Sequence, residues 1–500
     1  MRRRRSRFTK HLEVVEARVL LSGTVQSELV GDTLFLNGDD AGNEVRLRRF
    51  AVLDEATMEP TGTWMWEVKG LAETTVSGQT NFTDSIAHVV VDLGGGDDVL
   101  QVLDVTRSAS PSLSSLTVET GWGNDEILLH RINVSGRTTL DTGSGNDDIT
   151  LGASRVLDTY FGELFMTTGA GNDTIQGTSF QVHNKTWIYT GTGDDTVEFS
   201  IGVAPPTLDP PPLGTYTVAG YALGAASRFD DIQVITYGGV DRVTFNGVWT
   251  TGMAFVRSEY ISVETAHLDW TSLTGDKVQV GNAMAPPHPD FAPYVYNVIA
   301  TGNLTIHSDG MVDAESVRAL RSFGITRGPN RQLDVTPQIH VGRNADNTDG
   351  YWRTGVDVVN YFSAMSTGDV FLEGIRAFWR VRTRGKNISI RDVENQGQVA
   401  RHHPRQVYIE ADERLDITHL TTDSLYVFMS AGDNVINFDG VSTSTRSWVI
   451  ARDGNDEFHV LNSTFQTPLT AYGGPGSDTW YASGENIIWL DWEAGYPTIR

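Results

Sequence analysis

A glycine-rich phrase that closes on Asp or Asn returns nine times along the chain. Its fullest form is Gly143-Ser-Gly-Asn-Asp147, and the nine copies close at Asp98, Asp125, Asp147, Asp173, Asp195, Asp241, Asn434, Asp456 and Asp478. Copies within a run lie 22 to 27 residues apart, except for one gap of 46 residues that equals two such steps, and the phrase is missing between Asp241 and Asn434. A period of this length predicts a solenoid, in which each coil buries its apolar side only by stacking on its neighbours.

Apolar residues flank every copy at fixed offsets. Two positions after the closing residue stand Leu100, Ile127, Ile149, Ile175, Val197, Val243, Ile436, Phe458 and Trp480. We therefore expect each coil to contain a short strand, a tight Gly-Asx turn and a second short strand, with alternating apolar residues that face one interior. This pattern predicts an all-β, parallel β-helix with coils of about 22–27 residues. We expect a right-handed coil, because parallel crossovers nearly always have that hand.

The distribution of the phrase divides the chain into five segments. We predict a basic N-terminal segment at 1–22, a β cap with the first coil at 23–92, regular coils at 93–250, irregular coils with insertions at 251–424, and regular coils again at 425–500. Proline cannot donate to a strand ladder, so the Pro-rich stretches at 204–214 and 286–293 are expected to be loops.

One stretch of the irregular segment has the spacing of a helix. Val317, Leu320 and Phe323 recur at helical intervals, and Gly324 follows them as a stop signal. We therefore expect a helix over residues 313–323.

The charge of the chain limits its partners. The net charge is −25, and the basic segment 1–22 carries +5 of it, which leaves −30 for the remainder. A body this acidic repels nucleic acid and anionic membranes and attracts cations. The sequence contains no apolar run long enough to cross a membrane, so we expect neither nucleic acid binding nor membrane insertion. The absence of cysteine excludes disulfides and thiolate metal sites.

The N-terminal segment resembles a known address sequence. An Arg-rich start leads into Glu16-Ala-Arg-Val-Leu-Leu-Ser22. This stretch is similar to the LEPR-XLL segment of large exported proteins of planctomycete bacteria, in which Leu-Glu-Pro-Arg precedes two leucines. Val15 and Ala17 stand here in place of the Leu and the Pro. The resemblance covers 22 residues and implies an extracellular or cell-surface protein; from the residues alone, a disordered basic tail and a nuclear-type basic run remain open.

The Gly-Asx turns offer the ligands that calcium prefers. Calcium takes six to eight oxygens from carboxylates, Asn side chains and carbonyl groups. Stacked coils would place the turn carboxylates in columns with a spacing of about 4.8 Å, and cations between them would relieve the repulsion. The candidate metal ligands are Asp97, Asp98, Asn124, Asp125, Asn146, Asp147, Asn172, Asp173, Asp194, Asp195, Asn455 and Asp456.

A family resemblance supports the same cofactor in part. The phrase resembles the nonapeptide repeat of RTX (haemolysin-type) calcium-binding proteins, and Gly94-Gly-Gly-Asp-Asp-Val-Leu100 comes close to it. The RTX phrase recurs every nine residues, whereas this one occurs once per coil, so each site would have to form between coils. The alternative is that Asn and Asp satisfy the backbone of a tight turn in a metal-free ladder.

A second class of function is a polysaccharide-degrading β-helix. Asn347-Thr-Asp-Gly350 resembles one motif of polygalacturonases, and Arg401-His-His-Pro-Arg405 faintly resembles the Arg-rich sites of pectate lyases. Glycoside hydrolysis needs two carboxyl groups that face one sugar, and Asp357 or Asp369 would have to supply the second. An Asx turn and a solvated basic turn explain the same residues, so we name no catalytic residue.

These observations favour a non-catalytic, exported β-solenoid with a structural or adhesive role. Calcium is its candidate cofactor. Polysaccharide or cell-envelope components are the expected partners. The aromatic residues of the irregular middle, Tyr351, Trp352, Tyr361, Phe362 and Trp379, would provide either a sugar-stacking surface or part of the core.

Overall fold

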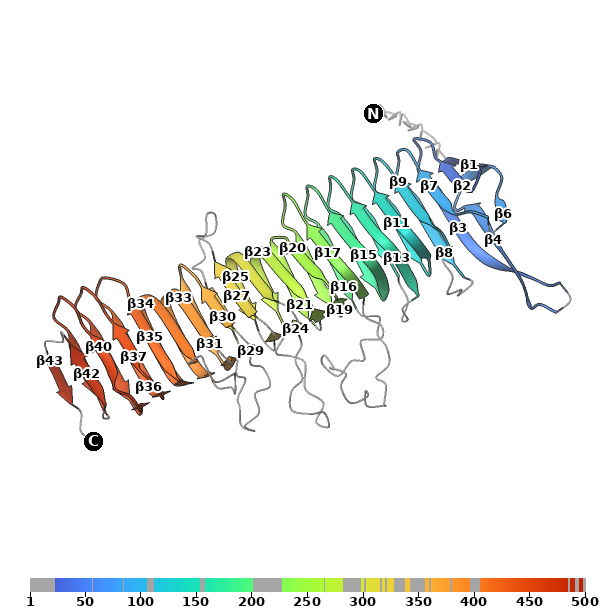
Figure 1. Cartoon of the computed structure of the whole chain (residues 1–500). Helices are drawn as coiled ribbons and strands as arrows, with labels where there is room; N and C mark the ends of the chain where they lie inside the picture. Colours follow the sequence, from blue (N-terminus) through green and yellow to red (C-terminus); the bar gives the residue numbers. More distant parts are fainter. Residues whose placement is uncertain are drawn as a thin grey trace, which may run out of the picture.

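The chain is a long all-β rod in which no helix occurs among the described residues (Figure 1). The structure is a computed structural model, and it describes residues 23–55, 57–83, 85–105, 112–152, 158–200, 227–264, 266–281, 298–300, 303–314, 317–319, 322–327, 338–341, 356–358, 361–377, 380–395, 405–483, 486–490 and 494–497. Strands stack in parallel along one axis from the blue end to the red end of Figure 1. The prediction of a parallel β-helix solenoid is confirmed, while the hand of the coil stays a prediction.

One face of the rod is a parallel sheet that we call the front sheet. It consists of β2 (Thr33–Asn37), β7 (His88–Asp92), β9 (Ser115–Glu119), β11 (Asn133–Asp141), β13 (Thr159–Thr167), β15 (Phe180–Tyr189), β17 (Ser227–Ile235), β20 (Met253–Arg257), β23 (Trp270–Val280), β25 (Leu304–Ala314), β27 (Ser322–Arg327), β30 (Tyr361–Met365), β33 (Arg380–Glu394), β34 (Gln406–Thr422), β35 (Ser424–Met429), β37 (Ser447–Ile450), β40 (Leu469–Tyr472) and β42 (Ile487–Leu490).

A second parallel sheet follows each Gly-Asx turn. It contains β3 (Glu44–Leu53), β8 (Val99–Asp104), β10 (Glu126–His130), β12 (Asp148–Leu151), β14 (Thr174–Thr178), β16 (Thr196–Ser200), β18 (Arg242–Asn246), β21 (Tyr260–Glu264), β28 (Gln338–Val341), β31 (Asp369–Glu373), β36 (Val435–Thr443), β38 (Glu457–Leu461), β41 (Thr479–Ala482) and β43 (Ala494–Pro497). The long strands β23, β25, β33 and β34 bend and contribute to both sheets.

A third face is made of very short strands. It contains β19 (Val248–Thr250), β22 (Ala266–Leu268), β24 (Val298–Ala300), β26 (Val317–Ala319), β29 (Val356–Val358), β32 (Ile375–Ala377) and β39 (Thr464–Phe465), together with the ends of longer strands. Each coil thus turns three corners, and the side chains that alternate inward from all three faces form one continuous core. Phenylalanines pack against one another within it from coil to coil, as Phe180 does edge-to-face against Phe199 at 5.4 Å between ring centroids.

The N-terminal end differs in its strand pairing. Strand β1 (Thr24–Val30) pairs antiparallel with β2 and parallel with β5 (Thr75–Gly78), while β3 forms an antiparallel hairpin with β4 (Pro60–Gly70), on which β6 (Asn81–Thr83) lies. These antiparallel strands occupy one end of the rod (Figure 1). An edge that is occupied in this way is less able to template pairing with another chain.

The prediction of a helix at 313–323 is wrong. The described residues of this stretch belong to the end of β25, to β26 and to the start of β27, and Val317 and Phe323 are fully buried in the core. The chain turns a corner between β26 and β27, and a corner shifts the in-and-out alternation of side chains. That shift produces a spacing between buried residues that resembles a helical one. The expected loops at 204–214 and 286–293, and the segment 1–22, lie outside the described residues.

Candidate functional site

The Gly-Asx turns stack directly on one another at the corner between the front sheet and the second sheet. The backbone amide of Ser144 donates to the carbonyl oxygen of Gly121 at 2.9 Å, and the amide of Gly145 donates to Ala170 at 2.8 Å. Gly145 has φ +138° and lies so close to the carbonyl of Gly123 that a Cβ atom would overlap it. Glycine is needed here both for its backbone conformation and for the close approach of successive coils.

The closing residues of the turns form a column that we call the inner ladder. In every coil after the first of a run, the Oδ1 atom accepts a hydrogen bond from the backbone amide of the closing residue one coil earlier. The amide of Asp98 donates to Asp125 at 2.8 Å, and that of Asp125 donates to Asp147 at 2.9 Å. The inner ladder comprises Asn43, Asp98, Asp125, Asp147, Asp173, Asp195 and Asp241 in one run and Asn434, Asp456 and Asp478 in another. The expectation that the 46 residues from Asp195 to Asp241 make two coils is wrong, because these two residues lie in adjacent coils.

The residues just before them form a second column, the outer ladder, which runs in the opposite direction. The amide of Asn146 donates to Oδ1 of Asn124 at 2.9 Å, so here each side chain binds the coil that follows it. The outer ladder comprises Asp97, Asn124, Asn146, Asn172 and Asp194 in one run and Asp433 and Asn455 in the other. Its side chains are exposed, whereas those of the inner ladder are buried.

Both runs of the inner ladder begin with asparagine. Asn434 has the amide nitrogen that an aspartate lacks, and its Nδ2 donates to the carbonyls of Ser430 and Gly432, at 2.9 and 2.6 Å. Asn43 donates in the same way to Asp39 and Ala41. In both runs, a side-chain donor thus caps carbonyl groups two and four residues earlier in the same turn.

Burial changes the acidity of the inner ladder. The seven aspartates Asp98, Asp125, Asp147, Asp173, Asp195, Asp241 and Asp456 are at most 2 % exposed, and their Oδ2 atoms have no hydrogen-bond partner among the described residues. Burial raises the pKa of Asp98 to about 8, and that of Asp147, Asp195 and Asp456 to about 6. The pKa values of Asp125 and Asp173 are raised by the same cause. A buried carboxyl without a cation beside it favours its protonated form.

The donor set of the inner ladder does not match a calcium site. Calcium takes six to eight oxygens, whereas the Oδ1 atom of each ladder aspartate already accepts a backbone N–H group, which leaves one free oxygen, Oδ2, on each carboxyl. Among the described residues, no group of three or more His, Asp or Glu side chains is placed to hold a metal ion. The hydrogen bonds of the inner ladder are those of the turn ladder that we weighed as the alternative, and calcium binding stays a prediction for experiment.

The residues of the enzyme alternative are scattered or lie outside the described part. Asn347–Gly350, residues 401–404, Tyr351, Trp352 and Trp379 are not described, and Asp357 lies in β29. Asp369 accepts a hydrogen bond from Nδ2 of Asn387 at 2.8 Å, and Phe362 is buried in the core.

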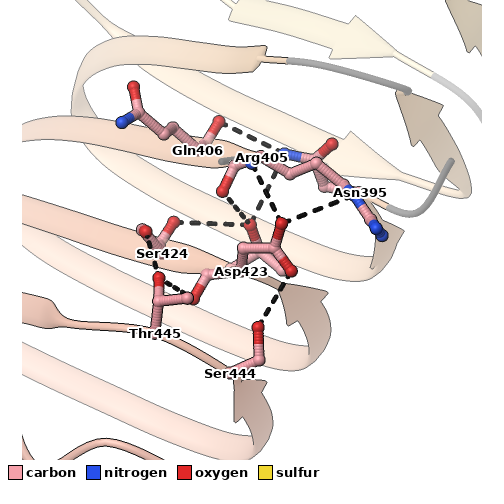
Figure 2. Close-up of polar contacts among 8 residues, drawn as sticks. Asn395, Arg405, Gln406, Asp423, Ser424, Ser444 and Thr445 are labelled. Atoms are coloured by element: carbon pink, nitrogen blue, oxygen red, sulfur yellow. Dashed lines mark hydrogen bonds and ion pairs between the residues drawn. The ribbon is translucent and has the colours of Figure 1, made fainter. Parts of the chain in front are cut away.

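Arg405, the last residue of the pectate-lyase-like motif, takes part in a structural corner. Figure 2 shows the carboxylate of Asp423 between Arg405 and Ser444. Oδ2 accepts the backbone amide of Arg405 at 3.1 Å and lies 3.5 Å from its Nε, while Oδ1 accepts the hydroxyl of Ser444 at 2.9 Å. The hydroxyl of Thr445 donates to the carbonyl of Asp423. Asp423 therefore binds three successive coils together at the start of the front sheet strands β34 and β35.

Comparison with protein-family models, with curated proteins and with solved structures finds no match for this chain. Among the described residues, no helix is long and apolar enough to span a membrane. The candidate list from the sequence omits Asn43, Asp241, Asn434 and Asp478, which also belong to the inner ladder. Asp241, Asn434 and Asp478 are each the last residue of a copy of the repeated phrase, so the repeat could have identified them from the sequence.

Proposed function

We propose that this protein is a non-catalytic structural rod of the cell surface, in which the two Asx ladders hold the coils together. The observation that carries the proposal is the opposite direction of the ladders: each coil is bound through the inner ladder to the coil before it and through the outer ladder to the coil after it. Stacked coils of this kind suit a stiff spacer, because every coil contacts only its neighbours and the rod grows with their number.

The proposed cell-surface location rests on the resemblance of residues 1–22 to the N-terminal segment of exported planctomycete proteins. The negative charge of the rest of the chain supports solubility in water. The non-catalytic role is supported by the use of the turn carboxyls in backbone hydrogen bonds, which leaves them ill suited to act on a substrate.

Small-angle X-ray scattering of the full chain tests the shape. We expect a monomeric rod roughly 80 Å long in its stacked front sheet, from about 4.8 Å per coil, with the same profile in EDTA and in calcium. A compact particle, or a rod that forms only in calcium, would contradict the proposal. Biotin labelling of intact source cells, followed by fractionation, tests the location: labelled protein in the envelope fraction is expected, and protein protected from the reagent would refute a surface role.

A further inference from the structure

The outward side of the front sheet carries a row of aromatic residues near its C-terminal end. The strand registers place Arg382, Tyr408, Tyr426 and Trp448 side by side on β33, β34, β35 and β37. Their rings lie close to one another, with centroids 6.2 Å apart for Tyr408 and Tyr426 and 5.8 Å apart for Tyr426 and Trp448. All three residues are partly exposed, so they form a surface feature and do not belong to the core.

A groove of about 410 Å³ lies over this row. This volume falls within the range of roughly 300–1,000 Å³ that is usual for ligand sites. The rings of Tyr408, Tyr426, Phe428 and Trp448 line it together with Gln406, and the charged residues in its described lining are Arg380 and Arg382. Among the described residues, no carboxylate lines the groove, so these residues do not provide the paired carboxyls of a glycosidase.

The charge around the groove is opposite to that of the chain. The outward positions of β33 carry Arg380, Arg382, Arg384 and Lys386, and Arg446 lies 4.8 Å above the ring of Trp448. Glu410 pairs with Arg382 at 3.1 Å and Glu413 with Lys386 at 3.1 Å, so cations remain in excess here although the net charge of the chain is −25.

The neighbouring contacts position the arginines for a ligand. Arg382 lies with its guanidinium carbon 5.5 Å from the ring centre of Tyr408, and Nη2 of Arg380 donates to Oε1 of Gln406 at 3.0 Å. The corner around Asp423 (Figure 2) fixes the starts of β34 and β35. These two strands carry Gln406, Tyr408 and Tyr426. A site built on rigid strands in this way needs little reorganisation to bind.

We propose that this groove binds an oligosaccharide that contains uronic acids. The aromatic faces suit the C–H faces of pyranose rings, because the face of an aromatic ring is electron-rich. Guanidinium groups recognise carboxylates with paired hydrogen bonds, which a neutral sugar does not offer. A peptide strand cannot add to this sheet, because β34 and β35 are paired on both edges. The inference does not rest on the structural role proposed above.

Isothermal titration calorimetry of the full chain with trigalacturonate tests the site. Maltotriose serves as the neutral sugar and oligo(dT) as the anion with stacking bases. We expect binding of trigalacturonate only. Arg382→Gln should weaken it by about tenfold or more, since the variant loses charged hydrogen-bond donors to the uronate carboxylate. Arg380→Gln is a second variant if Arg382→Gln lowers the thermal midpoint of unfolding.

A matched control exists on the same face of the rod. Trp187 on β15 lies beside Phe165 on β13, with 4.2 Å between the ring centroids. The Nζ atom of Lys185 lies 5.2 Å from the ring centre of Trp187. Trp187→Ala therefore removes an outward aromatic with a cationic neighbour while leaving the groove intact, and we expect it to preserve binding. The proposal is overturned if trigalacturonate does not bind, if maltotriose or oligo(dT) binds as well, if the arginine variants retain full affinity, or if Trp187→Ala loses as much affinity as they do.

Discussion

The carboxyl of Asp147 accepts the backbone amide of Asp125 at 2.9 Å, and its own amide donates to Asp173 at 2.9 Å. One residue thus connects three successive coils through two hydrogen bonds. Since the same geometry recurs through the inner ladder, each buried amide of that ladder depends on a single side-chain acceptor from the next coil.

Replacement of Asp147 separates the role of the acceptor from that of the charge. Asp147→Ala leaves the buried amide of Asp125 unsatisfied, which should lower the free energy of unfolding by about 1–3 kcal/mol. Asp147→Asn retains the acceptor and adds a donor, as in Asn434, and should equal or exceed the wild type at pH 8. Urea unfolding followed by circular dichroism measures both. Equal losses in the two variants would show that the ladder requires the negative charge.

The raised pKa values predict how stability varies with pH. In the folded chain, Asp98 titrates near 8 and Asp147, Asp195 and Asp456 near 6, whereas unfolded aspartate titrates near 4. Between these values the folded state binds more protons than the unfolded state, so stability decreases as pH rises. In EDTA we expect a higher thermal midpoint at pH 5 than at pH 8. Replacement of these four aspartates by Asn should flatten the profile; a midpoint that increases from pH 5 to pH 8 would contradict protonated ladder carboxyls.

The glycines of the stacked turns predict that two alanine substitutions will lower the stability by different amounts. Gly145 and Gly432 both have positive φ, +138° and +125°, but a Cβ atom on Gly145 would overlap the preceding coil, while one on Gly432 meets nothing within 4 Å. Gly432→Ala should therefore cost only backbone strain, about 1–3 kcal/mol. Gly145→Ala should cost more, since the coils must also move apart. Chemical denaturation of the two variants gives the comparison, and similar losses would show that close stacking is unimportant.

Calcium binding can be decided by thermal unfolding in calcium, magnesium and EDTA. A ligand that binds only the folded state raises the midpoint with its concentration. Because the Oδ1 atoms of the inner ladder already accept amide hydrogens, we expect no rise specific to calcium. A rise of many degrees in millimolar calcium that disappears in Asp125→Asn would establish the turns as metal sites and would refute the metal-free ladder.

Part of the structure could be predicted from residue types alone. Ile127, Ile149 and Ile175 recur at one offset after the turn, and all are fully buried on successive strands. This offset is local, so it is visible in the sequence. The corner between β26 and β27 could not be predicted, because Val317 and Phe323 are both buried although the chain changes direction between them. Spacing alone does not separate a corner from a helical turn.

The aromatic groove illustrates the other limit. Tyr426 and Trp448 stand six residues before Gly432 and Gly454, respectively, so the sequence alone could have placed them at the same position of successive coils. Tyr408 and Arg382 lie in coils without the phrase, and only strand pairing places them in the same row.

The sequence by itself determined the parallel β-helix, because its apolar offsets and glycine turns repeat once per coil and can be satisfied only by stacking. The tertiary structure alone decided what the Asx side chains do and which outward residues meet. Both depend on the hydrogen-bond register between coils of unequal length, and that register forms only when one coil lies on the next.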